Sequence, residues 1–472
     1  MSGSKTRKAP VLIAGAALVL VLFSIVALVF FSQPDRKPNL LILSIDTLRA
    51  DHLGAYGYGV DTSPNLDAFA RERGILFETV VAAAPSTTPS HASMFTSLLP
   101  AHHGALFSRR SPLSPDRTTM AEIFKAEGYR TACINDGGQM DAVWGLSQGF
   151  DEYITLPGVC PKAKLARNAK EALRWLEDAS VDERPWFLFL HTYETHHPYN
   201  AEARYYSEIG HEYSGDLPMT LDKDILKRIN DGKLELKEAD RHHIIAAYDA
   251  EIRSMDAALA DLLDRLERRG LMDETVVIIT SDHGEELGEH GMMGWHSHAL
   301  WDEQLLVPLV IRLPGDERAG ARVVGQARGI DLLPTVLQLL SMASPPEIEG
   351  RSLVSMIDGT DTSPRPAVSQ RDTVVDPLPA SIRIGEKKLY RKEGAENPLL
   401  FDTAADPREQ RDLFEESAGD VEILEAALDR IVGERPLAKT PGTVEIEEAT
   451  AKQLKALGYI DDPDAAPPGG DR

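Results

Sequence analysis

Apolar runs alternate with amphipathic segments along most of this chain of 472 residues. The first run, Asn39–Asp46 (NLLILSID), is apolar over most of its length and ends in an acid. A run of this kind is typical of a strand that is buried on both faces, as in a parallel sheet. Similar runs lie at 131–136, 185–193, 275–284 and 307–313, and helical patterns separate them at 63–74, 118–129, 169–179, 246–270 and 330–340. The alternation predicts an α/β fold with a mostly parallel sheet flanked by helices.

The pattern changes after about Gly359. Short strands with turns are predicted at 366–376, 380–392 and 398–407, and helices at 421–432 and 447–460. The last residues are rich in Pro, Gly and Asp, and we expect them to be disordered. The resulting organisation is a basic tail (1–10), a transmembrane anchor (11–31), a linker (32–37), a catalytic domain (38–359), a small α+β subdomain (360–440) and a short helix with a disordered tail (441–472).

The anchor is predicted from Val11–Phe31, an uncharged stretch that is long enough to span a bilayer as a helix. Lys5, Arg7 and Lys8 precede it, which favours an N-terminus in the cytoplasm and a catalytic domain outside it. A cleaved signal peptide would have a shorter apolar region and a small-residue cleavage site, and the sequence after Phe31 offers no clear one.

Composition excludes some classes of function. The net charge of −24 argues against a nucleic-acid partner, since phosphate backbones bind basic surfaces. Two cysteines, Cys133 and Cys160, are too few for a zinc cluster or a disulfide scaffold, although one disulfide or two free thiols remain open.

Polar side chains follow several of the predicted strands: Asp46, Asn135 with Asp136, Glu194 with His196, and Asp282 with His283. Ligand sites of open α/β sheets lie at the carboxyl ends of the strands, so this placement indicates an enzyme. Further histidines lie close by in sequence: His191, His197, His296 and His298. A mixed oxygen and nitrogen set suits Zn²⁺ or Mn²⁺ better than Ca²⁺. Alternatively, Asp46 caps a turn and individual histidines are structural.

The segment APSTTPSHAS (84–93) places five hydroxyl side chains around two prolines and a histidine. Pro89 suits the first turn of a helix, so Thr87 or Thr88 would lie at its positive end, where an anion is favoured. A metal ion beside such a hydroxyl lowers its pKa and makes it a nucleophile. The alternative is a simple helix cap, a common role of Ser and Thr.

Seven segments together resemble, in order, the sulfatase-type branch of the alkaline phosphatase superfamily. They are LSIDTLRADHLGAYGY, TTPSHASMFTSLLPAHHG, HTYETHHPY, TSDHGEELGEHG, LWDEQLLVPLVIRLPG, LFDTAADPREQRDL and KALGYI. The similarity runs from about residue 38 to about residue 460 and implies an alkaline-phosphatase-like fold. The sulfatase signature begins with a Cys or Ser that becomes formylglycine. Here Thr87 stands at that position and His91 at the arginine position, so the resemblance implies no formylglycine.

The form Thr-x-Pro-x-His is instead similar to the nucleophile motif of nucleotide pyrophosphatase/phosphodiesterases, a two-zinc branch. This resemblance implies a Thr87 nucleophile and two divalent metals, zinc first, with manganese or calcium as alternatives. One metal would be held by Asp46, Thr87, Asp282 and His283, and the second by Glu194, His196 and His298. Asn135 is similar in position to an oxyanion-stabilising Asn.

The main expectation is therefore a membrane-anchored hydrolase that cleaves phosphate mono- or diesters through a covalent Thr87 intermediate. The alternatives are a true sulfatase and an envelope phospho-group transferase. A non-catalytic binding protein is disfavoured, because it would not need Asp46, Thr87, Asp282, His283 and His298 together. The oligomeric state is not indicated.

Overall fold

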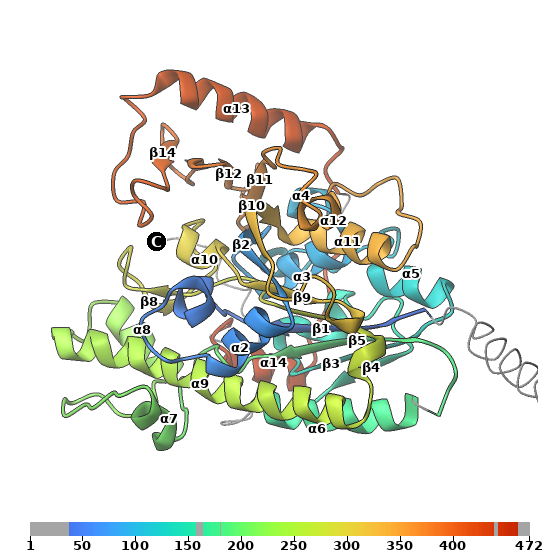
Figure 1. Cartoon of the computed structure of the whole chain (residues 1–472). Coiled ribbons are helices and arrows are strands. Elements are labelled where there is room, and N and C mark those ends of the chain that lie inside the picture. The colour runs from blue at the N-terminus through green and yellow to red at the C-terminus, as the bar shows by residue number, and fades with distance from the viewer. Residues whose placement is uncertain (1–36, 157–163, 180, 439–441, 461–472) are drawn as a thin grey trace, which may run out of the picture. The chain divides into compact units, whose positions relative to one another are not determined.

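The structure is a computed structural model that describes residues 37–156, 164–179, 181–438 and 442–460 (Figure 1). The predicted basic tail, the apolar span 11–31, nearly all of the linker, Cys160 and the end 461–472 lie outside these residues. Within the described ranges, no helix is both long enough and apolar enough to cross a membrane. The chain divides into Met1–Pro38 and Asn39–Arg472, and all elements named below belong to the second unit.

The centre of this unit is a sheet in the order β10-β2-β9-β6-β1-β5-β3-β4. Its strands are β1 (Asn39–Ile45), β2 (Ile75–Val81), β3 (Arg130–Asn135), β4 (Glu152–Thr155), β5 (Trp186–Thr192), β6 (Thr275–Thr280), β9 (Leu309–Arg312) and β10 (Arg322–Arg328). All neighbouring pairs are parallel except those of β9, which is antiparallel to β6 and to β2. The sheet is therefore mostly parallel, as predicted.

The strand β1 shows why its sequence is apolar without alternation. Leu40 and Ile42 belong to the core on one face of the sheet, whereas Leu41 and Leu43 belong to the core on the other. Successive side chains of a strand point to opposite faces, so a strand covered on both sides needs apolar residues at every position. Burial of each such side chain stabilises the fold by about 1.5–3 kcal/mol.

Helices cover both faces of the sheet (Figure 1). One face carries α3 (Thr87–Thr96), α5 (Met120–Ala126) and α11 (Leu332–Leu339), and the other carries α2 (Pro64–Glu72), α6 (Lys164–Ala179) and α9 (Glu238–Arg268). Shorter helices are α4 (Pro100–His103), α7 (Ala203–Glu208), α8 (Lys223–Asn230), α10 (Asp302–Leu305) and α12 (Val354–Ile357). Two short strands, β7 (Glu286–Leu287) and β8 (Met293–Trp295), pair after β6.

A second, antiparallel sheet follows in the order β11-β12-β13-β14. Its strands are β11 (Ala367–Gln370), β12 (Ala380–Ile384), β13 (Lys387–Arg391) and β14 (Leu399–Asp402), and α13 (Ala418–Gly433) packs on it. Lys388 of β13 connects this sheet to α10, because its buried Nζ lies 2.7 Å from Asp302 Oδ1 and also 2.7 Å from Glu409 Oε1. The last described helix is α14 (Glu448–Ala456).

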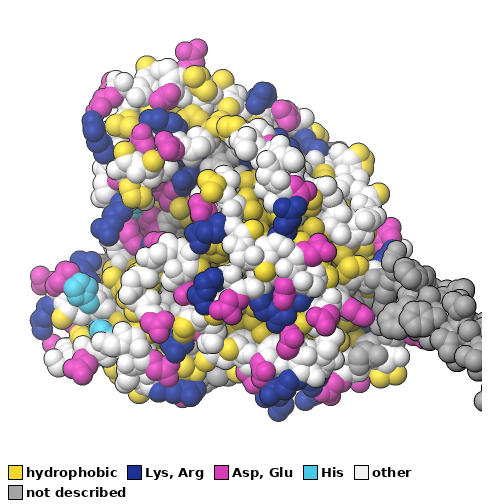
Figure 2. Space-filling view, in the orientation of Figure 1, with side chains coloured by type: hydrophobic (Ala, Val, Ile, Leu, Met, Phe, Trp, Pro, Cys, Tyr) yellow, Lys and Arg dark blue, Asp and Glu magenta, His cyan; other side chains and the backbone are white. Residues whose placement is uncertain are grey.

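Figure 2 shows acidic and basic side chains interspersed over the face it displays, without a large patch of one sign. This distribution is typical of a solvated surface and agrees with the acidic net charge.

Candidate active site

The carboxylate of Asp46 lies directly after β1 and is fully buried. Its Oδ2 accepts a hydrogen bond from Thr87 Oγ1 at 3.1 Å and lies 3.3 Å from His191 Nε2. Its Oδ1 has no hydrogen-bond partner among the described residues. Burial raises the pKa of Asp46 to about 6, although the nearby His283 opposes the effect. The site thus contains a buried acceptor that a cation would satisfy.

Asp282 and His283 follow β6, the strand beside β1, and are also fully buried. Asp282 Oδ1 accepts the N–H of His283 at 3.0 Å and the N–H of Thr47 at 3.4 Å. Thr47 reaches this position with a φ of 58°, a conformation that is costly for a β-branched residue. Burial and the charge of Asp46 raise the pKa of Asp282.

His283 is held in the orientation of a ligand. Its Nδ1 donates to the carbonyl oxygen of Gly284 at 2.9 Å, so the proton is on Nδ1 and the lone pair is on Nε2. Neither His283 Nε2 nor Asp282 Oδ2 has a hydrogen-bond partner within the described part of the chain. Asp46, Asp282 and His283 each offer a ligand atom, and these atoms lie within 4.8 Å of one another. Two carboxylates and an imidazole, buried and unpaired, fit a divalent cation.

Thr87 begins α3, after Ser86 in extended conformation. Its neighbours in the hydroxyl-rich segment have other partners: Thr88 Oγ1 donates to Gln139 O at 2.7 Å, and Ser90 Oγ donates to Asp282 O at 2.7 Å. Only the Thr87 hydroxyl contacts Asp46 among the described side chains of this segment. The helix N-terminus beside it favours negative charge. Thr87 is therefore both the first residue of a helix and the hydroxyl nearest to the predicted metal ligands.

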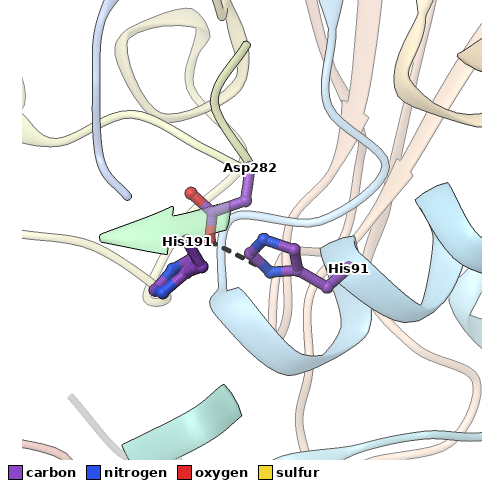
Figure 3. Close-up of side chains that lie close together, drawn as sticks. All are labelled: His91, His191 and Asp282. Atoms are coloured by element: carbon purple, nitrogen blue, oxygen red, sulfur yellow. Dashed lines mark ion pairs between the residues drawn. The ribbon is translucent and has the colours of Figure 1, made fainter. Parts of the chain in front are cut away.

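His91 points from α3 toward Asp282, with His191 on the other side of that carboxylate (Figure 3). His91 Nδ1 lies 3.6 Å from Asp282 Oδ2 and donates to Thr87 O at 2.8 Å, whereas Nε2 lies 2.9 Å from Ser44 Oγ. Burial lowers the pKa of His91 to about 4, so its ring is neutral at pH 7. Both ring nitrogens thus have partners, and the contacts fix the first turn of α3 beside Asp282.

Two further histidines complete the cluster. The ring of His296 lies 4.6 Å from that of His283 and 4.9 Å from that of His196, between ring centroids. Glu285 Oε1 accepts from His296 Nδ1 at 2.9 Å. Burial lowers the pKa of both His196 and His296 well below the usual value for histidine. Both rings are therefore neutral at pH 7, and the two nitrogens of His196 are engaged by His197 O and by the Tyr459 hydroxyl.

The structure places the other predicted residues in different surroundings. Both oxygens of Glu194 are engaged, Oε2 by the Leu165 N–H at 2.8 Å and Oε1 by Ser254 Oγ at 2.8 Å. His298 Nε2 lies 2.8 Å from Glu286 Oε2. Among the described residues, neither Glu194 nor His298 shares a hydrogen bond with Asp46, Thr87 or Asp282. The second metal position thus stays a prediction, and His296 rather than His298 contacts the ring of His283.

Asn135, predicted as an oxyanion-stabilising residue, lies at the end of β3. Its Oδ1 accepts the Gly137 N–H at 2.8 Å and the Thr155 hydroxyl at 3.3 Å. These bonds shape the loop after β3, and the oxyanion role stays a prediction.

Comparisons with known proteins identify the family of the chain. The sulfatase family model matches residues 38–342. An ulvan-active sulfatase of Formosa agariphila is 29% identical over 80% of this chain and 77% of its own length. A multifunctional alkaline phosphatase superfamily protein of Trinickia caryophylli is 26% identical over 81% of this chain and 92% of its own length.

Among solved structures, a phosphonate monoester hydrolase of Agrobacterium radiobacter superposes with a TM-score of 0.69 at 22% identity, covering 87% of this chain and 98% of its own. This likeness shows the alkaline-phosphatase-like fold. Members of the sulfatase family depend on a metal, and the buried cluster of Asp46, Asp282 and His283 is a possible place for it. Most of the curated relatives are named as sulfatases, which favours the sulfatase alternative over the phosphate-ester reading expected from the sequence. The chain therefore belongs to the sulfatase family of the alkaline phosphatase superfamily, and it is a hydrolase of sulfuric or phosphoric esters.

Proposed function

We propose that this protein hydrolyses sulfuric esters, with Thr87 as the nucleophile and with Asp46, Asp282 and His283 as metal ligands. The observation that carries the proposal is the position of Thr87 Oγ1 at a helix N-terminus, 3.1 Å from Asp46 Oδ2 and beside three ligand atoms without partners among the described residues. A divalent cation bound there would polarise the ester and lower the pKa of the attacking hydroxyl.

The residues of the chain prepare the attack. Asp46 orients the Thr87 hydroxyl, and the first turn of α3 places backbone dipoles where negative charge develops. As Thr87 Oγ bonds to sulfur, its hydroxyl proton passes to Asp46 Oδ2, the bond from sulfur to the alcohol oxygen breaks, and the alkoxide leaves with its electron pair and takes up a proton from water. Water then hydrolyses the Thr87 ester. His91 takes no part in proton transfer in this scheme, because its two nitrogens are engaged by Thr87 O and Ser44 Oγ.

Phosphoric esters, including diesters, are the second candidate substrates. The specific observation is Thr87 itself, which stands where a formylglycine precursor would be a Cys or Ser. A sulfated threonine lacks the elimination route that a formylglycine diol provides, so its breakdown requires direct attack by water. A Thr87 ester of phosphoric acid is hydrolysed by the same direct route.

The test compares the wild type with Thr87→Ala and the matched variant Thr88→Ala, on aryl sulfates, phosphate monoesters, phosphate diesters and phosphonates. Thr88→Ala removes an equally buried hydroxyl whose partner is Gln139 O rather than Asp46. We expect Thr87→Ala alone to lose at least about 10³-fold in kcat, as removal of a nucleophile does. Full hydrolysis of all four ester classes by Thr87→Ala would exclude Thr87 as the nucleophile.

Metal analysis of the purified protein identifies the cofactor, for which zinc is the first candidate and manganese or calcium the alternatives. The buried imidazole of His283 favours zinc or manganese over calcium, which prefers oxygen ligands. Calcium together with sulfatase activity alone would contradict both the zinc assignment and the phosphate-ester reading.

We propose also that residues 11–31 anchor the protein in a membrane, with the N-terminus in the cytoplasm and the catalytic domain outside. The support is the uncharged stretch Val11–Phe31 and the basic residues Lys5, Arg7 and Lys8 before it. Protease added to intact cells should then remove the catalytic domain, whereas full protection of the domain would reverse the orientation.

A further inference from the structure

The last described residues of the chain return to the candidate active site, 372 positions after Thr87. The Tyr459 hydroxyl lies 3.2 Å from Thr87 Oγ1 and 2.9 Å from His196 Nε2. Its ring lies 5.5 Å from that of His196 and 5.8 Å from that of His296, between centroids. The C-terminal segment thus contributes a hydroxyl that touches the proposed nucleophile.

The direction of these hydrogen bonds follows from the tautomer of His196. Its Nδ1 lies 2.6 Å from the carbonyl oxygen of His197, which can only accept, so the proton is on Nδ1. A neutral ring then accepts at Nε2, and Tyr459 donates its hydrogen there. The Tyr459 oxygen is left with its lone pairs toward Thr87, whose own hydroxyl hydrogen is held between Asp46 Oδ2 and Tyr459.

The segment that carries Tyr459 is firmly packed. Leu454, Leu457 and Ile460 are buried in the core that also contains α3. Gln453 Oε1 accepts the Gly138 N–H at 3.1 Å, and Lys223 Nζ donates to Ile460 O at 3.2 Å. Tyr459 is therefore fixed from both sides along the chain.

The turn before Tyr459 requires a glycine at position 458. Its φ of +88° is a left-handed conformation that glycine adopts without strain. A Cβ at this position would lie 2.7 Å from His197 Nε2, too close for any other residue without a shift. In the sequence Leu457-Gly458-Tyr459-Ile460, the two outer residues are thus buried in the core. Between them, Gly458 makes the turn and Tyr459 carries the hydroxyl.

We propose that Tyr459 is a catalytic residue, supplied by the C-terminal segment, whose hydroxyl oxygen accepts a hydrogen bond from the Thr87 hydroxyl and so orients the nucleophile. A substrate must place its sulfur or phosphorus within about 3–3.5 Å of Thr87 Oγ1. A lone pair of Thr87 Oγ1 must then point at that atom, and the contact of 3.2 Å with the Tyr459 oxygen helps to fix this direction because it engages the Thr87 hydrogen. The proposal rests on the proposed role of Thr87.

The test is Tyr459→Phe in the full chain, purified in detergent. The variant keeps the ring against His196 and His296 and removes only the hydroxyl. We expect kcat to fall about 10- to 100-fold while KM changes less than about threefold, because the lost interaction acts on the nucleophile in the transition state. In a single-turnover experiment, formation of the Thr87 ester should slow by the same factor.

The matched control is Tyr56→Phe, which removes the hydroxyl of a half-buried tyrosine that also has two hydrogen bonds, to Phe77 O at 3.0 Å and from Leu309 N at 2.9 Å. It should lower the melting temperature as much as Tyr459→Phe does and leave kcat unchanged. A Tyr459→Phe protein with wild-type kcat, or with a raised KM alone, would overturn the proposal. Thr87→Ala is measured in parallel. If Thr87→Ala stays active, the proposed nucleophile is wrong. If Thr87→Ala is inactive and Tyr459→Phe is fully active, only the proposed role of Tyr459 is refuted.

Discussion

We predict that the buried side chain of Asp46 makes the stability of the folded protein depend on pH. Its pKa is raised from 3.8 to about 6 in the folded protein, chiefly by burial. Because the pKa of Asp46 is higher in the folded protein than in the unfolded protein, folding favours the protonated form of this side chain. The stability that this provides is fully present below about pH 4 and is lost as the pH rises through about 6. The difference between 3.8 and about 6 corresponds to a loss of about 3 kcal/mol.

The perturbation is Asp46→Asn, which has nearly the same shape and cannot ionise. Without metal, the free energy of unfolding of the variant should rise relative to that of the wild type as the pH increases. The expected relative gain is about 2–3 kcal/mol between about pH 4 and pH 7.5. Other buried acids that do not interact with Asp46, such as Glu251 with a pKa of about 8, titrate equally in both proteins and cancel from the comparison.

With a bound metal, the wild type should instead be more stable than Asp46→Asn at pH 7.5. Metal in large excess over its Kd stabilises the folded wild type by about 4 kcal/mol at a thousandfold excess, and Asp46→Asn should lose most of this gain. The assay is urea unfolding followed by circular dichroism, with and without chelator, at both pH values.

The exposed Asp116→Asn is the control and should match the wild type throughout. Two results would refute the reasoning. A metal-free Asp46→Asn that is less stable than the wild type at pH 7.5 would show that the buried carboxylate has compensating partners. Equal stabilisation of both proteins by metal would show that Asp46 is not a ligand.

Three further variants test individual features. Gly458→Ala places a side chain on a residue with a left-handed φ and against His197 Nε2. It should lower kcat as Tyr459→Phe does, measured by steady-state kinetics, and should lower the free energy of unfolding by about 1–3 kcal/mol, measured by urea unfolding. Lys388→Met leaves the buried Glu409 without its cation and leaves Asp302 with Arg383 alone, so it should cost about 3–5 kcal/mol in the same unfolding assay; an unchanged midpoint would contradict the ion-pair role. Thr47→Gly relieves a φ of 58° but removes the buried hydrogen bond from Thr47 Oγ1 to Asp46 O at 2.7 Å, so the two effects should offset and the melting temperature should change by no more than a few degrees; a larger fall would show that the side chain contributes more than the strain costs.

The local pattern of the sequence was sufficient to predict the elements that are buried on both faces. The runs at 39–46, 131–136 and 185–193 became β1, β3 and β5, because a strand between two helical layers needs apolar residues at every position. The strands β2, β4 and β10, of which β4 and β10 are the edges of the sheet, were not predicted. Nothing in the run at 307–313 indicated that β9 is antiparallel, because the apolar pattern encodes burial and not the direction of a strand.

The sequence by itself determined the family, the mostly parallel sheet and the group Asp46, Thr87, Asp282 and His283, since each of these follows a strand or begins a helix that the pattern reveals. Only the tertiary structure decided that His296 rather than His298 contacts His283, and that Tyr459 lies against Thr87. Two histidines that are two residues apart are equivalent in a sequence, and their choice depends on the turn at Ser297, whose φ is 68°. The contact across 372 residues depends on how α14 packs, and packing is a property of the whole core and not of any local segment.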